Sequence, residues 1–204
     1  MRPGGFGYGI TNTFSMRSTF SIARAAAAGL CAAFLLCAPA IEAAPTEMQS
    51  LAATLHESEF SARVERLLKQ NRPAQAVELA EIGINRNPRN AQLQFMRSIG
   101  LERLGRTEEA AKSLLSLIAA YPEIPEPYNN LAVIEAGFGN LEDAVRLLNQ
   151  ALAINPDFAT ARKNLGDVFL ALAIENYEKA APVLSGNDAL QTRLKTLQRL
   201  VDRK

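Results

Sequence analysis

The sequence predicts an all-α protein in which helix-turn-helix units stack into a solenoid. The first observation is a proline that recurs every 34 residues, at Pro88, Pro122 and Pro156. The second is an alanine that keeps the same step, at Ala76, Ala110 and Ala144. The third is the helical spacing of apolar residues on both sides of a short turn within each unit. Residue types that recur at one fixed period indicate a repeat architecture rather than a single globular bundle.

The composition is that of a soluble domain. Of the 204 residues, 48% are hydrophobic and 21% are charged, and the formal net charge is +1. This balanced charge provides little attraction for phosphate groups, so nucleic-acid binding is disfavoured. Both cysteines, Cys31 and Cys37, lie in the N-terminal segment that we expect to be removed. The mature protein would therefore contain no disulfide, thiolate metal site or cysteine nucleophile.

Residues 1–43 are predicted to be a signal peptide. An apolar stretch without charge, residues 25–41, follows Arg24 and ends among small residues, which is the order of a secretory signal. Cleavage is expected near Ala43, with Ala40 as the second possible cleavage point, and translation could begin at Met16. We therefore expect a periplasmic or secreted protein, which would contact the membrane only through this segment if it stayed uncleaved.

The recurring residues define three units of equal length, 57–90, 91–124 and 125–158, after a linker or an extra helix at 44–56. The third unit shows the pattern most clearly. Its second helix carries apolar residues at the spacing of one helical face, at Leu141, Val145, Leu148, Ala151 and Leu152. The recurring alanines are expected where the two helices cross, because a methyl side chain allows the two backbones to approach closely.

Turn residues separate the two helices of each unit and keep the same period, at Asn71, Gly105 and Gly139. Gly139 has the backbone freedom to end the first helix of its unit. Asn140 is expected to cap the second helix by accepting a backbone N–H, with Asp143 at the acidic position of the capping box. Pro156 ends the second helix because a proline cannot continue it.

These units resemble the tetratricopeptide repeat, whose pattern over 34 residues is W-x2-L-G-x2-Y, then A-x3-F, then P. The third unit matches best, with Tyr128 in the Trp position, Leu131-Ala132 for Leu-Gly, Ala144, Leu148 for Phe, and Pro156. The first and second units match more loosely, and the resemblance covers about 57–170. It implies an α-solenoid of three full repeats and one partial repeat.

The partial fourth unit, 159–184, begins in register and then departs from the pattern. Leu165-Gly166 and Phe169 occupy the expected places, but the turn glycine and the packing alanine are both replaced. We therefore expect one elongated helix to about residue 184, with a break near Asn176 as the alternative.

Residues 188–203 are predicted to form a capping helix at the end of the stack. Asp188 is expected to be its N-cap. Apolar residues lie on one face of this helix, at Leu190, Leu194, Leu197 and Val201. A stack of repeats must cover its last apolar face with an element whose other side is polar, and this helix has that character.

In such a stack the first helices of successive units line a concave surface. The resemblance implies that this groove binds a peptide or a partner protein, through the second, fifth, sixth, ninth, twelfth and thirteenth positions of each first helix. Carried onto this sequence, the candidate groove residues are Phe95, Ile99, Arg103, Asn129, Asn130, Val133, Lys163, Asn164 and Asp167.

Asn130 and Asn164 both occupy the sixth position and lie one repeat apart. An amide donates and accepts at once, so the pair could bind an extended peptide backbone of any sequence; the alternative is that each asparagine ties neighbouring helices together. Lys163 could pair with a carboxylate of the ligand, or could simply be solvated. Phe95 and Ile99 could form an apolar floor of the groove, or could pack between repeats.

Nothing in the sequence points to catalysis. His56 is the only histidine and its acidic neighbours lack metal-ligand spacing, and no phosphate-binding loop, G-x-S-x-G or H-E-x-x-H motif occurs. We therefore expect no enzymatic activity, no cofactor and no metal site. The leading hypothesis is an adaptor or scaffold of the bacterial cell envelope that binds a protein or peptide partner. The alternative is a structural module or assembly factor that self-associates through its helical surfaces.

Overall fold

The computed structural model describes residues 44–184 and 186–202. Over these two ranges the regular structure consists of helices, and no strand is present. The predicted signal peptide, residues 1–43, lies outside the described residues. None of the helices in the described ranges has both the length and the hydropathy needed to cross a membrane.

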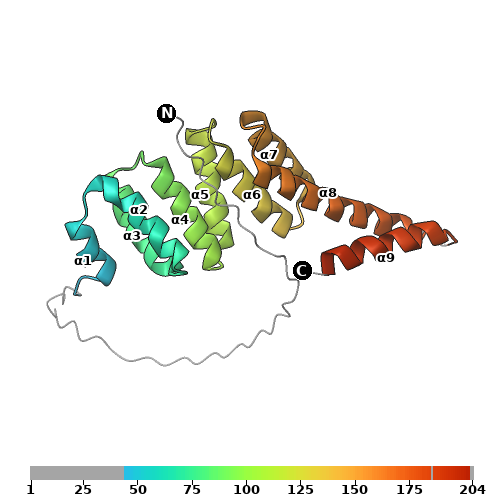
Figure 1. Cartoon of the computed structure of the whole chain (residues 1–204), viewed down its shortest axis with the longest axis horizontal. Coiled ribbons are helices and arrows are strands. Elements are labelled where there is room, and N and C mark those ends of the chain that lie inside the picture. The colour runs from blue at the N-terminus through green and yellow to red at the C-terminus, as the bar shows by residue number, and fades with distance from the viewer. Residues whose placement is uncertain (1–43, 185, 203–204) are drawn as a thin grey trace, which may run out of the picture.

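Three helical pairs form the body of the molecule, as the repeat spacing predicts. The pairs are α2 (Phe60–Lys69) with α3 (Pro73–Arg86), α4 (Ala91–Arg103) with α5 (Thr107–Ala120), and α6 (Pro125–Gly137) with α7 (Leu141–Ile154). Before them lie α1 (Glu47–Thr54), which packs on α3, and the short 3-10 helix η1 (Glu57–Glu59); after them come α8 (Ala159–Ala180) and α9 (Asp188–Asp202). From α2 onward each helix packs against the next, so the fold is the predicted α-solenoid (Figure 1).

The turn inside each pair repeats one backbone geometry. Its central residue has a positive φ in all three units, 55° at Asn71, 74° at Gly105 and 85° at Gly139. The N–H of the following residue donates to the carbonyl five positions earlier, each time at 2.9 Å, from Arg72 to Leu67, Arg106 to Leu101 and Asn140 to Glu135. These bonds satisfy carbonyl groups at the end of the first helix and reverse the chain.

Two of the expected N-caps are wrong. The side chain of Asn140 accepts no backbone N–H of α7. Asn140 completes the turn instead, and its amide reaches back to α6 and donates to Glu135 Oε2 at 2.7 Å. Asp188 is the first residue of α9 rather than its cap. Asn187 Oδ1 accepts the N–H of Leu190 at 3.0 Å, so the cap lies one residue earlier.

The recurring alanines lie where the paired helices cross, and Ala76, Ala110 and Ala144 are all 0% exposed. One apolar cluster joins α1 to α6, and a second joins α6, α7 and α8. Tyr128, in the aromatic position of the third unit, belongs to the second cluster, and its hydroxyl donates to the Pro122 carbonyl at 3.2 Å. The alanines that recur every 34 residues therefore occupy equivalent buried positions in the three units.

The fourth unit consists of one elongated helix, since α8 continues without a break through Asn176. Ser98 and Ala132, which pack inside their own units, are 2% and 0% exposed. At the equivalent Gly166 an added Cβ would meet nothing within 4 Å, and Phe169 on the same helix is 52% exposed. This face of α8 therefore lacks the second helix that covers it in the other units, and α9 packs farther along α8 (Figure 1).

Candidate functional site

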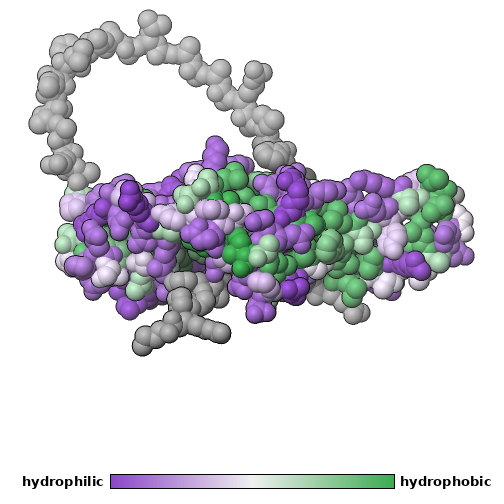
Figure 2. Space-filling view, turned by 90° about the horizontal axis from the view of Figure 1, so that it is seen from above, coloured by the Kyte–Doolittle hydropathy of each residue, from purple (hydrophilic) through white to green (hydrophobic). Residues whose placement is uncertain are grey.

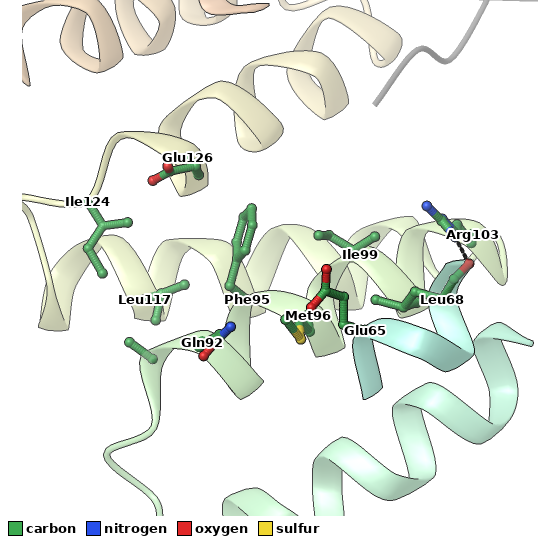
Figure 3. Close-up of a pocket in the computed structure, with 11 residues that line it drawn as sticks. Glu65, Leu68, Gln92, Phe95, Met96, Ile99, Arg103, Leu117, Ile124 and Glu126 are labelled. Carbon is green, nitrogen blue, oxygen red and sulfur yellow. Dashed lines mark hydrogen bonds between the residues drawn. The ribbon is translucent and has the colours of Figure 1, made fainter. Parts of the chain in front are cut away.

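A pocket opens among the first helices of the three pairs (Figure 3). Helix α4 provides most of its wall, and α2 provides Glu65 and Leu68. Ile124, directly before α6, and Glu126, in the first turn of α6, line the other side. The cavity volume is about 250 Å³. It lies on the surface lined by the first helices, which is where the repeat pattern predicts the groove.

The pocket exists because α4 and α6 diverge. The first helices of the other neighbouring units pack on each other, α2 on α4 and α6 on α8. Helices α4 and α6, in contrast, make few contacts with each other. The linker between their units, residues 121–124, contains Pro122, and Ile124 has the extended dihedrals φ −92° and ψ 118°. Proline disfavours a helical conformation in the residue before it, so α6 begins at Pro125, directly after Ile124.

The pocket floor is apolar and is continuous with the hydrophobic core. Phe95 is 8% exposed and Ile99 3% exposed, and both belong to the large cluster while also lining the pocket. The two roles proposed for these side chains are therefore compatible. Met96 and Leu68 complete this floor.

Charged side chains lie around the rim of the pocket. Glu65 forms an ion pair with Lys69 at 2.7 Å, and Arg103 Nη1 donates to the Leu68 carbonyl at 2.5 Å. Glu126 is half-buried, and no side chain among residues 44–184 and 186–202 forms a hydrogen bond or ion pair with it. The rim therefore combines the Glu126 carboxylate, which has no partner among the described residues, with the Arg103 guanidinium, one N–H of which is engaged.

Several pocket residues were not among the predicted groove residues. Glu65 and Leu68 occupy the ninth and twelfth positions of the first unit, so carrying the same positions onto that unit would have found them. Leu117 and Ile124 lie outside the first helices, and no positional rule of the repeat predicts them.

The predicted asparagines come together in a second, separate cluster. Asn164 Nδ2 donates to Asn129 Oδ1 at 2.9 Å, and Asn129 Nδ2 donates to Asn130 Oδ1 at 3.0 Å. All three are buried, with Asn129 at 0%, Asn130 at 2% and Asn164 at 8% exposure. The chain of amides ties α6 to α8, and Asn130 Nδ2 is left without a hydrogen-bond partner in the described part of the molecule.

The remaining predicted residues do not join either cluster. Lys163 pairs with Asp167 at 2.7 Å on the exposed face of α8. Val133 is half-buried on α6 and does not line the pocket. The structure thus brings together Phe95, Ile99 and Arg103 in the pocket, and the role of the other candidates in binding stays a prediction.

No metal centre is found within the described ranges, where no three His, Cys, Asp or Glu side chains gather as ligands. His56 is exposed and has a local structural role. Its Nδ1 accepts the N–H of Ser58 at 3.4 Å and caps the short helix η1.

Comparison with known families explains this arrangement. A tetratricopeptide repeat model matches residues 61–125, and a second TPR repeat model matches residues 139–172. The chain contains tetratricopeptide repeats. A search among curated proteins finds no match to this sequence.

Solved tetratricopeptide-repeat structures have the same fold. TTC0263, a TPR protein of Thermus thermophilus, is 21% identical, with a TM-score of 0.55 over 72% of this chain and 84% of that one. The second TPR domain of human RPAP3, in complex with the HSP70 peptide SGPTIEEVD, is 20% identical, with a TM-score of 0.51 over 55% of this chain and 93% of that one. YrrB, a TPR protein with an unusual peptide-binding site, is 22% identical, with a TM-score of 0.51 over 57% of this chain and 60% of that one. The fold of this chain is therefore a tetratricopeptide-repeat solenoid.

Proposed function

We propose that this protein is a non-enzymatic adaptor or scaffold of the bacterial cell envelope, which binds a segment of a partner protein in its concave groove. The observation that carries the proposal is the apolar pocket between α2, α4 and α6, with Phe95 and Ile99 at its floor. A concave apolar site with a few polar groups at its rim is the form that binding sites usually take.

The solved relatives support peptide binding as the kind of interaction. The RPAP3 domain was solved with a bound peptide, and YrrB is described by its peptide-binding site. Both share the helical-pair stack with this chain. The proposal takes from them only that the partner is a peptide segment, and it does not transfer their ligands.

Export to the envelope is supported by the sequence of the first 43 residues alone. Expression in a bacterial host followed by fractionation and intact-mass measurement tests it. A periplasmic product that begins at Ala44 is expected. Recovery from the cytoplasm with residues 1–43 intact would refute export and leave the groove proposal standing.

A pair of photo-crosslinking variants tests the groove. Gln92 lines the pocket on α4, whereas Gln94 lines a polar hollow together with Arg97 and Ser113. Two residues along a helix correspond to a rotation of about 200°, so Gln92 and Gln94 face opposite sides of α4. A photo-reactive amino acid at Gln92 should crosslink an exported protein in living cells, and the same amino acid at Gln94 should not.

The two positions make the result interpretable. Mass spectrometry of the crosslinked product would identify the partner and the segment that lies in the groove. Crosslinks of equal yield from both positions, or from Gln94 alone, would mean that the partner does not use the concave surface.

A second function, self-association, is favoured by the open face of α8 and by the C-terminal hairpin. Phe169 is 52% exposed, and Val183 and Leu184 in the α8–α9 turn are 84% and 48% exposed. Figure 2 shows apolar residues at the right-hand end of the molecule, where α8 and α9 meet. A second copy could cover these side chains by supplying the helix that the fourth unit lacks, since apolar patches on a monomer are often interfaces.

Light scattering tests self-association with a matched pair of variants. Phe138, which follows α6, is 50% exposed and serves as the control for Phe169. If a second copy covers the open face, the purified protein is a dimer, Phe169→Asp is a monomer and Phe138→Asp remains a dimer. A monomeric wild-type protein at high concentration would eliminate this function.

A further inference from the structure

Charged side chains lie at the two ends of the pocket, and its floor between them is apolar. Figure 3 shows Arg103 on one side of the pocket and Glu126 on the other, with Phe95 and Ile99 between them. Arg103 is the last residue of α4, and Glu126 lies in the first turn of α6. A ligand that lies across the apolar floor therefore meets a positive group at one end and a negative group at the other.

The length of the pocket wall limits the size of the bound segment. Gln92, Phe95, Ile99 and Arg103 lie on one face of α4 and line the pocket together. The last is eleven positions after the first, which corresponds to about 16 Å at a rise of 1.5 Å per residue. An extended chain advances about 3.3 Å per residue, so about five residues span this face.

The middle of the pocket is suited to an apolar side chain. The cavity volume of about 250 Å³ has room for several water molecules, since one needs about 10–15 Å³ of such space. Its floor offers those waters few hydrogen-bonding groups, because Phe95, Met96, Ile99 and Leu68 line it. Replacing the waters by an apolar side chain is therefore favourable.

The charges at the rim are not equivalent. Glu65 is already paired with Lys69, so it contributes little net field. Glu126 has no partner in residues 44–184 and 186–202 and is half-buried, which strengthens its interaction with an incoming cation relative to a fully solvated carboxylate. Arg103 donates one N–H to the Leu68 carbonyl, and a guanidinium has five N–H donors, so donors remain for a carboxylate.

We propose that the groove recognises an extended segment of about five residues with an apolar side chain at its centre, a lysine or arginine at the Glu126 end and a carboxylate at the Arg103 end. This inference rests on the proposed groove function and specifies the chemistry of its partner. The basic side chain pairs with Glu126, and the apolar side chain contacts Phe95 and Ile99. An acidic tail without a basic residue would leave Glu126 unpaired and is disfavoured.

Two peptide pools of opposite polarity test the proposal. Both have five residues with leucine at the centre; one has lysine first and aspartate last, the other aspartate first and lysine last, and the remaining two positions are randomised. Fluorescence anisotropy with the full-length protein should show that one pool binds more tightly than the other. A third pool, with alanine at both ends, should bind about three- to tenfold more weakly than the preferred one, the range expected for partly exposed charge pairs.

A charge reversal at Glu126 separates recognition from a purely structural role. Glu126 also lies in the first turn of a helix, where any carboxylate interacts favourably with the helix dipole. Glu126→Lys should weaken binding of the preferred pool about tenfold and should strengthen binding of a pool in which its lysine is replaced by glutamate. Glu123→Lys, an exposed position outside the pocket, changes the net charge equally and should leave both affinities unchanged.

The outcomes distinguish this inference from the function on which it rests. Inversion of the charge preference by Glu126→Lys and not by Glu123→Lys supports it. Binding of all leucine pools with equal affinity, unaffected by Glu126→Lys, overturns the charge specificity while the groove function stands. Absence of binding by every pool, together with absence of crosslinking at Gln92, overturns both.

Discussion

Replacing Asn164 by alanine should weaken the packing of α8 on α6, because it removes the donor at one end of the buried amide chain. Asn129 Oδ1 accepts the Asn164 Nδ2–H at 2.9 Å and is in a residue that is 0% exposed. Without Asn164 this oxygen stays buried and unpaired. The desolvation cost of such an orphaned acceptor is about 1–3 kcal/mol. Alanine also favours the helix by about 0.5 kcal/mol relative to asparagine, which offsets part of the loss.

Asn149→Ala is the matched control. Asn149 is an exposed residue of α7, so the same change there alters helix propensity without breaking the amide chain. The difference between the two variants therefore isolates the buried network. We expect Asn164→Ala to be less stable than Asn149→Ala by about 1–3 kcal/mol.

Urea unfolding followed by far-ultraviolet circular dichroism measures this difference, since the chain has no tryptophan to serve as a fluorescent probe. With an m-value of about 2 kcal/mol/M, the two midpoints should differ by about 0.5–1.5 M. Coinciding midpoints would refute the view that the asparagines tie α6 to α8. If the asparagines do tie α6 to α8, a double-mutant cycle with Asn129→Ala should give a coupling energy of about 0.5–1.5 kcal/mol for the Asn129–Asn164 bond.

Other substitutions test the turns, the helix crossings and the surface charges. Gly139→Ala should lower the free energy of unfolding by about 1–2 kcal/mol, because an L residue is strained at φ 85°. Gly166→Ala inside α8 should raise the free energy of unfolding by about 0.5–1 kcal/mol. Urea midpoints of the two variants that move in the same direction would contradict this account. Ala144→Leu should lower the free energy of unfolding by about 1–3 kcal/mol by forcing α6 and α7 apart, and an unchanged urea midpoint would mean that the crossing tolerates bulk. The hydrogen bond from Arg106 lowers the pKa of Glu109, so the pair favours the folded state at neutral pH and this contribution is lost as the pH falls through the lowered pKa. Arg106→Ala should return the pKa of Glu109 towards its ordinary value in a carboxyl NMR titration, and an unmoved titration would show that the hydrogen bond is not its cause.

The sequence was sufficient to predict the repeat architecture. The period that joins Ala76, Ala110 and Ala144 corresponds to three equivalent helix crossings, all fully buried. Local chemistry also predicted the turns, since Gly105 and Gly139 have the positive φ that glycine tolerates best. These features depend on neighbours within one unit, so the pattern along the chain contains them.

The N-caps and the asparagines show where local reasoning stops. Asn140 and Asp188 have side chains suited to capping, but the Asn140 amide bonds to Glu135 and Asn187 caps α9 one residue before Asp188. The repeat positions suggest a row of sixth-position asparagines that faces a ligand, whereas Asn164 bonds to Asn129 in the fifth position of the preceding unit. Whether an amide faces the groove or a neighbouring helix depends on how adjacent repeats are rotated against each other.

By itself, then, the sequence determined the unit: two helices, a left-handed turn residue, a small residue at the crossing and a proline at the end, each set by the conformations that its own side chain allows. Only the tertiary structure decided how the units meet. It placed the pocket between α2, α4 and α6, where α4 and α6 make few contacts with each other, and it brought Glu126 and Arg103 to opposite sides of that pocket. The distance between two residues on different units depends on how whole helix faces pack, and no short stretch of sequence determines that packing.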